Sequence, residues 1–314
     1  MRIGNREFDT EHNVYIMGIL NVTPDSFSDG GRFSELDAAL FQTEKMVAEG
    51  AAIIDIGGES TKPGADFVSA QEELERVLPV ISAVKKRFNV PISLDTYKSE
   101  VAAEGIRNGV DVINDIWGLR YDAVKSDSVS KKESGKQTMA QVIAQNPSAS
   151  CILCANARGA AAEGQTPEAA NMTKKPSPVN DIAADAMQKR IPDRIDMAMQ
   201  YLAKSILIAE QAGIKRDRII LDPAIGFGWG SEADLKILNN LERLNLMLYP
   251  VMLAASRKSV IGAVLGDDAG DRLAGTLALT AVGVMKGCSF IRVHDVKENL
   301  RAAKMALAVR ESGT

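Results

Sequence analysis

The sequence predicts an α/β protein that folds as a single (β/α)₈ TIM barrel with long loops after its first two strands. Eight short apolar runs alternate with eight stretches of helical periodicity, and no long linker separates them. A chain of 314 residues has room for one large barrel. An apolar fraction of 46% with only 5% aromatic residues suits helices layered on a buried parallel sheet.

A doubly wound open sheet is the alternative architecture. It would leave the last two βα units without a place in the sheet, and no G-x-G-x-x-G motif follows the first strand. We therefore expect one domain over residues 1–314. Residues 119–137 interrupt its rhythm, because they are mostly polar and have no useful period. We expect a flexible insertion there that packs against nothing.

The strands are recognised as short, almost wholly apolar runs, a pattern typical of strands buried on both faces of a parallel sheet. They are expected in the first half of residues 14–33 and at residues 51–56, 91–95, 110–113, 149–154, 218–222, 250–254 and 289–293. In a parallel sheet each strand needs a crossover before the next one, so the stretches between them should be helical.

Apolar residues at helical spacing fill these intervening stretches. The expected helices span residues 35–49, 69–88, 99–108, 138–145, 181–211, 231–244, 276–285 and 295–310. Gly50 and Gly109 end two of them, and Pro192 is a candidate interruption in the fifth. Ser231 is the expected N-cap of the sixth, with Asp234 three residues later.

Two loops at strand ends are long, polar and rich in glycine. The first follows the first strand, ends in the Gly30-Gly31 pair and carries Phe27 and Phe33 among polar groups. Aromatic residues in such a loop suggest that it closes over a ligand. The second loop, residues 57–64, follows the second strand.

Composition and charge argue against several classes of protein. A formal net charge of −4 gives no basic field of the kind that nucleic-acid-binding proteins use. The N-terminus does not resemble a signal peptide, and no apolar run approaches the ~20 residues needed to span a bilayer. Cys151 and Cys154 form a C-x-x-C pair inside an apolar run, which a buried strand explains better than zinc or redox chemistry. We therefore expect a soluble protein in the reducing cytoplasm.

Every expected strand is followed by polar or charged side chains. In chain order these are Asn21, Asp55 with Thr61 and Lys62, Asp95, Asn114, Asn156, Asp222, Ser256 with Arg257 and Lys258, and Arg292 with His294. Any single one could cap a helix or be solvated. Because barrel active sites lie at the carboxyl ends of the strands, eight such groups around one mouth indicate an active site.

Three of these groups suit a flat polar ligand. Asp95, Asn114 and Asp222 follow the third, fourth and sixth strands. They can present acceptors and an amide to a planar heterocycle with amino and lactam edges.

A second set of groups suits an anion. Lys258, Arg292 and His294 follow strands seven and eight, and we expect them on the opposite side of the mouth, with Asn21 beside them. Three donors and one hard oxygen ligand make an anion site that could share Mg²⁺. His12, the other histidine, precedes the first strand and is expected to be inert.

Seven short motifs occur at these strand ends and loops. They are residues 21–31 (N-V-T-P-D-S-F-S-D-G-G), 55–64 (D-I-G-G-E-S-T-K-P-G), 94–96 (L-D-T), 114–115 (N-D), 222–228 (D-P-A-I-G-F-G), 256–262 (S-R-K-S-V-I-G) and 292–294 (R-V-H). Through them the chain resembles the dihydropteroate synthases over nearly its whole length. The resemblance implies a pterin-binding barrel that joins 6-hydroxymethyl-7,8-dihydropterin pyrophosphate to p-aminobenzoate, forming 7,8-dihydropteroate and releasing pyrophosphate. Such enzymes are sulfonamide targets.

Carried over position by position, the resemblance implies a role for each motif residue. The pterin would contact Asp95, Asn114, Asp222 and Lys258. Pyrophosphate and Mg²⁺ would be held by Asn21, Arg292 and His294. p-Aminobenzoate would be received by Thr61, Ser256 and the closing loops, and Lys62 would line its pocket. Catalytic roles would fall to Asp95, Lys258, Arg292 and His294.

The chain departs from the family pattern at three positions. Trp229 stands where the family usually has lysine, Asn156 where a histidine is usual, and Lys62 where arginine is usual. Two alternatives are therefore a degenerate pterin-binding barrel without synthase activity and a pterin-dependent methyltransferase. The methyltransferase would need neither the anion site nor the loop after the first strand.

The seventh expected helix, residues 276–285, carries more apolar side chains than one barrel wall can bury. They are Ala278, Leu279, Ala281, Val282, Val284 and Met285. Because they lie on more than one face of the helix, we expect this helix to form an interface. The sequence therefore predicts a homodimer, as the family resemblance also implies.

Overall fold

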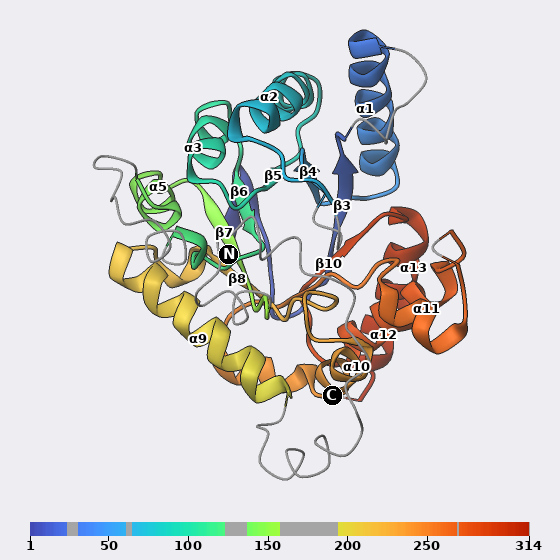
Figure 1. Cartoon of the computed structure of the whole chain (residues 1–314). Coiled ribbons are helices and arrows are strands. Elements are labelled where there is room, and N and C mark those ends of the chain that lie inside the picture. Colours follow the sequence, from blue (N-terminus) through green and yellow to red (C-terminus); the bar gives the residue numbers. More distant parts are fainter. Residues whose placement is uncertain (24–30, 61–64, 123–136, 158–193, 269, 314) are drawn as a thin grey trace.

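The computed structural model describes residues 1–23, 31–60, 65–122, 137–157, 194–268 and 270–313. Its eight parallel strands follow the order β8-β7-β6-β5-β4-β3-β10-β9 in one sheet. A further parallel bridge between Leu221 and Val251 joins the two ends of this order, so the sheet closes into a barrel. Helices surround the strands (Figure 1). The predicted (β/α)₈ fold is confirmed.

All eight predicted strands are present, with bounds close to the expected ones. They are β3 (Tyr15–Asn21), β4 (Ile53–Gly57), β5 (Ile92–Asp95), β6 (Val112–Asp115), β7 (Ser150–Cys154), β8 (Ile219–Asp222), β9 (Met252–Leu253) and β10 (Phe290–Val293). Nearly all their residues are buried, because one face of each strand fills the barrel and the other packs against helices.

The predicted helices are confirmed where they fall on described residues. They are α1 (Gly31–Ala48), α2 (Ala70–Arg87), α3 (Ser99–Arg107), α5 (Met139–Gln145), α9 (Arg194–Ala212), α10 (Ser231–Asn239), α12 (Leu273–Met285) and α13 (Val296–Glu311). The seven-residue helix α11 (Ser259–Leu265) was not expected. Position 192, where the fifth helix was expected to be interrupted, lies outside the described residues.

The sixth predicted helix differs at both ends. Ser231 is its first helical residue and not its N-cap, which is Gly230 with a φ of 81°. The Asp234 carboxylate instead accepts a hydrogen bond from the Gly226 amide at 3.0 Å, inside the loop after β8. The helix ends at Asn239, and a 3₁₀ helix (Leu241–Met247) follows it.

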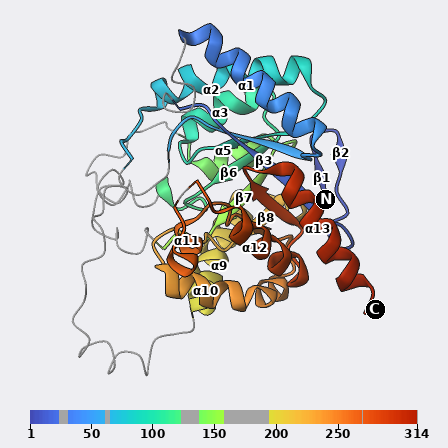
Figure 2. The same cartoon turned by 90° about the vertical axis from the view of Figure 1, so that its right-hand side faces the viewer.

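An N-terminal hairpin, which the sequence did not predict, packs against the barrel. Its strands β1 (Arg2–Ile3) and β2 (Arg6–Glu7) have two residues each, too few for a recognisable period. After it, the ring of Phe8 lies 4.7 Å from that of Tyr15 and 5.8 Å from that of Phe290, measured between centroids. Figure 2 shows the hairpin at the end of the barrel where the N-terminus lies.

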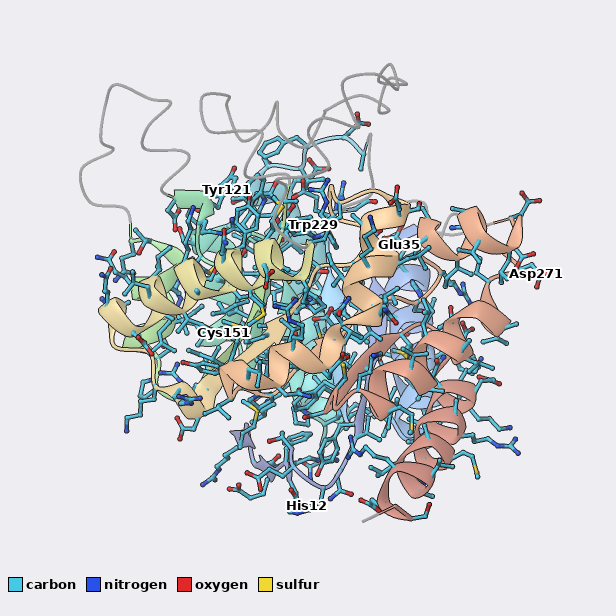
Figure 3. All side chains as sticks on the ribbon, turned by 90° about the horizontal axis from the view of Figure 1, so that it is seen from below. His12, Glu35, Tyr121, Cys151, Trp229 and Asp271 are labelled. Atoms are coloured by element: carbon cyan, nitrogen blue, oxygen red, sulfur yellow. The ribbon has the colours of Figure 1, made fainter. Side chains whose placement is uncertain are left out.

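His12 lies far from the carboxyl ends of the strands. Figure 3 shows it at the end of the molecule opposite to Trp229 and Tyr121. Its Nδ1 is 3.2 Å from the Asp9 carboxylate in an exposed turn. This position agrees with the expectation that His12 takes no part in the reaction.

The start of the expected insertion is packed. Leu119 and Tyr121 are buried, and the Leu119 amide donates a hydrogen bond to Asp115 at 2.7 Å. The expectation that residues 119–137 pack against nothing is therefore wrong at their beginning. Residues 123–136 lie outside the described part of the chain.

The cysteines are structural. Cys151 and Cys154 are buried on β7, and burial raises the pKa of Cys151 to about 12. No group of three or more histidine, cysteine or acidic residues that could hold a metal ion is found in the described ranges. The expectation that both cysteines lie on a buried strand is therefore confirmed. Across the same ranges, no helix has the length and apolarity needed to cross a membrane.

Candidate active site

Polar side chains gather at the carboxyl ends of the strands, as the sequence predicts. Asn21, Asp95 and Asp222 are the last residues of β3, β5 and β8. Asn114 lies on β6, Ser256 and Lys258 follow β9, and Arg292 and His294 lie at the end of β10. The expected p-aminobenzoate residues Thr61 and Lys62 lie outside the described residues.

Arg292 joins three strands at the centre of the site. Its Nε donates to Asp55 Oδ2 at 2.5 Å, and its Nη2 donates to Asp95 Oδ2 at 2.7 Å. The Nδ2 of Asn114 also donates to Asp55 Oδ2, at 3.2 Å. The expectation that Arg292 lies across the mouth from Asp95 is wrong, because an arginine side chain can span the narrow interior of an eight-stranded barrel.

The protonation of this cluster follows from its burial. Burial raises the pKa of Asp95 to about 7, while Arg292 acts in the opposite direction. Burial also acts to lower the pKa of Arg292, but Asp55 and Asp95 raise it above its ordinary value, so the guanidinium stays charged. Asp95 Oδ1 is buried and has no hydrogen-bond partner among the described residues. It is an acceptor that a ligand N–H could use.

Asn114 on β6 and Asp222 at the end of β8 lie beside this cluster. Asp222 Oδ1 accepts the Ala224 amide at 2.7 Å, which holds the turn after β8. The Cys154 thiol lies 3.9 Å from Asn114 Oδ1 and donates to it. Burial raises the pKa of Asp222, against the lowering effects of the Ala224 amide and Lys258. Two strands thus direct a carboxyl and an amide to one place.

Lys258 is a buried cation on the same side. Its Nζ donates to the Ile225 carbonyl at 2.7 Å and lies 4.1 Å from the centre of the Phe227 ring. Burial lowers its pKa to about 8, although Asp222 acts to raise it. Lys258 therefore lies close to the predicted heterocycle pocket.

Ser256 and His294 form a pair at the ends of neighbouring strands. Ser256 Oγ lies 3.0 Å from His294 Nδ1 and accepts the His294 backbone N–H at 3.3 Å. Next to them Arg257 makes a two-bond ion pair with Asp295, at 2.6 and 3.1 Å. Ser256 is thus engaged with His294, and Arg257 with Asp295.

Asn21 is the candidate Mg²⁺ ligand. It is exposed at the end of β3, and a Cβ built on Gly57 would lie 3.7 Å from its Oδ1. The resemblance to the synthases implies that Asn21 would be the protein ligand of this ion. This suits Mg²⁺, which commonly binds one or two protein oxygens together with substrate phosphates and water.

Arg120 is a mouth residue that sequence reasoning missed. Its Nη2 donates to the Asn156 carbonyl at 3.1 Å, and its guanidinium carbon lies 4.7 Å from the centre of the Tyr201 ring. Tyr201 in turn lies 5.9 Å from the Trp229 ring. Two of the three departures from the family pattern, Asn156 and Trp229, thus belong to one packed group. Only its position five residues after Asp115 could have pointed to Arg120.

A buried ion cluster next to the site was also missed. Lys98 Nζ contacts the carboxylates of Glu59 and Glu73, and the Tyr97 hydroxyl donates to Glu59 at 3.1 Å. Burial raises the pKa of Glu73. The cluster connects α2 and the residues after β4 to the residues after β5. No spacing of these residues along the sequence predicts it.

Comparisons with known proteins agree on one family. Residues 17–294 match a family described as pterin binding enzyme. A dihydropteroate synthase of Clostridium beijerinckii is 42% identical over 306 residues, 97% of each chain. One of Bacillus subtilis is 42% identical over 303 residues, 96% of this chain and 91% of that one.

Solved structures agree with the sequence matches. A Clostridium difficile dihydropteroate synthase determined in the presence of pteroic acid has a TM-score of 0.78 and 40% identity, covering 96% of this chain and 99% of that one. A Yersinia pestis dihydropteroate synthase in complex with a sulfonamide drug has a TM-score of 0.80 and 33% identity, covering 99% of both chains.

Proposed function

The chain belongs to the family of pterin-binding enzymes and acts as a dihydropteroate synthase, a transferase of folate biosynthesis, and we propose that its mouth divides the reaction between a pterin pocket and an anion pocket. The similarity to named synthases over nearly the whole chain favours this activity over an inactive barrel or a methyltransferase. The observation that carries the proposal is the Arg292 guanidinium, which Asp55 and Asp95 hold where the two pockets meet.

The proposed pterin pocket consists of Asp95, Asn114, Asp222 and Lys258. Carboxylates and an amide at strand ends offer acceptors to the amino and ring N–H groups of a pterin. The unpartnered Asp95 Oδ1 supports this role, because a ligand donor would satisfy it. Lys258 would donate to the acceptors of the ring.

The proposed anion pocket consists of Arg292, His294 and Asn21. Arg292 and His294 lie at the same end of β10, and Arg292 remains cationic because two carboxylates flank it. Asn21 would bind Mg²⁺ together with the pyrophosphate. The ion, when bound, would neutralise charge on the leaving pyrophosphate.

These pockets suit a reaction through a stabilised cation. The bond between the pterin methylene carbon and the pyrophosphate oxygen breaks, and its electron pair leaves with pyrophosphate. Arg292 and His294 would stabilise that leaving group, while Asp95 and Asp222 would stabilise the developing positive charge on the pterin. The p-aminobenzoate nitrogen then bonds to the methylene carbon and loses a proton.

p-Aminobenzoate would bind beside the pterin methylene carbon. Thr61 and Lys62 are the proposed contacts. Ser256 was also expected to contact p-aminobenzoate. Its hydroxyl instead contacts both the backbone N–H and the ring Nδ1 of His294, which favours a different role for it.

We propose that the protein is a cytoplasmic homodimer. Its three cysteines are free and buried, as suits a reducing compartment. The dimer is supported by apolar side chains left exposed on α12 and α13, which include Val282 and Met305.

The proposed activity is tested by incubating the protein with the pterin pyrophosphate, p-aminobenzoate and Mg²⁺ and measuring pyrophosphate release and 7,8-dihydropteroate. Arg292→Ala should lose most of the rate, because the leaving group loses its cation. Pterin binding without any condensation product would indicate the inactive barrel. Transfer of a methyl group from a methylated folate to a corrinoid would indicate the methyltransferase.

A further inference from the structure

Ser256 and His294 make two contacts with each other just after the neighbouring strands β9 and β10 end. Ser256 Oγ accepts the backbone N–H of His294 at 3.3 Å and lies 3.0 Å from its ring Nδ1. Ser256 is only 7% exposed, so water can satisfy little of its hydroxyl. Both residues lie at the proposed anion pocket.

The direction of the contact to the ring follows from the hydrogen-bonding capacity of a hydroxyl. A serine hydroxyl has one donor hydrogen and two acceptor lone pairs. The His294 amide uses one lone pair, and the ring contact must use either the hydrogen or the other lone pair. If Nδ1 carried the proton, the Ser256 hydrogen would need another acceptor, and the described residues supply none.

We propose that Ser256 is a positioning residue that donates its hydroxyl hydrogen to Nδ1 of neutral His294 and thereby fixes the ring in the Nε2–H tautomer. The backbone contact fixes the serine, and the serine fixes the ring. Nε2 then carries the N–H, the group that a phosphate oxygen accepts. The benefit for catalysis rests on the proposed function of His294 in binding pyrophosphate.

Nuclear magnetic resonance of the ring nitrogens tests the tautomer directly. The chain has only two histidines, His12 and His294, so ¹⁵N-histidine labelling gives two ring systems, and His12→Gln identifies them. The spectra are recorded at about pH 8.5, where a free imidazole is neutral. We expect His294 to show an unprotonated Nδ1 and a protonated Nε2. A protonated Nδ1 in the unsubstituted protein would overturn the proposal.

Substitutions separate positioning from packing. Ser256→Ala should give His294 a mixture of tautomers and raise the KM for the pterin pyrophosphate several-fold, and Ser256→Thr should restore both. Ser289→Ala is the matched control, because Ser289 is 4% exposed at the other end of β10 and donates to the Thr10 carbonyl. It should leave the His294 signals unchanged.

The outcomes distinguish the two roles. An unchanged tautomer in Ser256→Ala would overturn the positioning role. If Ser256→Ala loses the single Nε2–H tautomer and Ser256→Thr restores it, the positioning role is supported, whether the KM for the pterin pyrophosphate or that for p-aminobenzoate changes. If in that case only the KM for p-aminobenzoate rises, the assignment of His294 to pyrophosphate is wrong, while the tautomer assignment holds.

Discussion

Arg292 on β10 donates a hydrogen bond to Asp55 on β4 over 2.5 Å, although β3 lies between these two strands. Asp55 is fully buried and lies two residues before the end of β4, deeper in the barrel than Asp95 at the end of β5. It holds the guanidinium from below while Asp95 holds it from the mouth. The position of the main cation of the site thus depends on a carboxylate placed too deep to be an obvious ligand contact.

Asp55→Asn should therefore reduce both stability and activity. Removing one partner of a buried ion pair leaves a charge poorly compensated, and we expect a loss of about 3 kcal/mol in the free energy of unfolding. We also expect kcat/KM to fall by about tenfold or more, the effect of about 1.4 kcal/mol. Asp295→Asn is the matched control, because the Arg257–Asp295 pair is partly exposed and should be worth no more than about 1 kcal/mol. Equal losses in urea unfolding would contradict the importance of the Asp55 contact.

The pH profile of kcat/KM for the pterin substrate should be bell-shaped. Burial raises the pKa of Asp95 to about 7 and lowers that of Lys258 to about 8. Below the first value Asp95 gains a proton and stops being an ionised acceptor, and above the second Lys258 loses its charge. We expect kcat/KM for the pterin substrate to be highest between these values.

Lys258→Arg distinguishes this origin of the alkaline limb from others. Arginine stays charged over the whole range, so this limb should disappear while the acid limb remains. Arg292, Asp55 and Glu73 also act on the pKa of Asp95. If the alkaline limb persists in Lys258→Arg, another group causes it.

Asp222→Asn should weaken pterin binding. Asparagine retains an oxygen that can accept the Ala224 amide, so the turn after β8 should persist while the negative charge is lost. A hydrogen bond to a charged group contributes about 1.5–3 kcal/mol, so Kd should rise about 10- to 100-fold in calorimetry. Asp234 is a buried carboxylate that accepts the Gly226 amide, and Asp234→Asn should change the Kd for the pterin much less. Unchanged pterin affinity in Asp222→Asn would exclude the anchor role.

The sequence predicted the barrel well because its signals are local. Each strand is an apolar run, and the stop residues Gly50 and Gly109 have φ values of 101° and 97°, which glycine tolerates without strain. The hairpin at Arg2–Glu7 and helix α11 were not predicted, because two-residue strands and a seven-residue apolar helix show no recognisable period.

The sequence located the mouth of the barrel but not the contacts within it. Strand ends identified Asp95, Asn114, Asp222 and Arg292, because the fold brings all strand ends together. Their pairing depends on side-chain reach across the barrel, which spacing along the chain does not encode. Lys98 illustrates this, since its partners Glu59 and Glu73 come from other elements.

Leu248→Gly should stabilise the protein. Leu248 has a φ of 60°, in the left-handed region that costs a non-glycine residue about 1–2 kcal/mol, and its side chain is 74% exposed. Glycine would remove this cost, and the greater freedom of the unfolded chain would offset about 0.4–1 kcal/mol. We expect a net gain of about 0.5–1 kcal/mol. Leu246→Gly, at a residue 75% exposed inside the preceding 3₁₀ helix, should instead destabilise the protein. Urea unfolding of both variants measures the difference, and a loss at both positions would contradict it.

The predicted homodimer should depend on α12 and α13, which lie side by side (Figures 1 and 2). Val284 is buried against the barrel and cannot belong to the interface, contrary to the expectation from the sequence. Val282 and Met285 on α12 and Met305 and Val309 on α13 are exposed, which leaves an apolar surface on adjacent helices.

Light scattering at micromolar concentration should give the mass of two chains. Val282→Glu should give one chain, because a charge buried in an apolar interface has no partner. Leu207→Glu is the matched control, since Leu207 is 53% exposed on α9, away from α12 and α13 in Figure 1, and should leave the dimer intact. A monomer mass for the unsubstituted chain would rule out the dimer, and a dimer that survives Val282→Glu would place its interface on another surface.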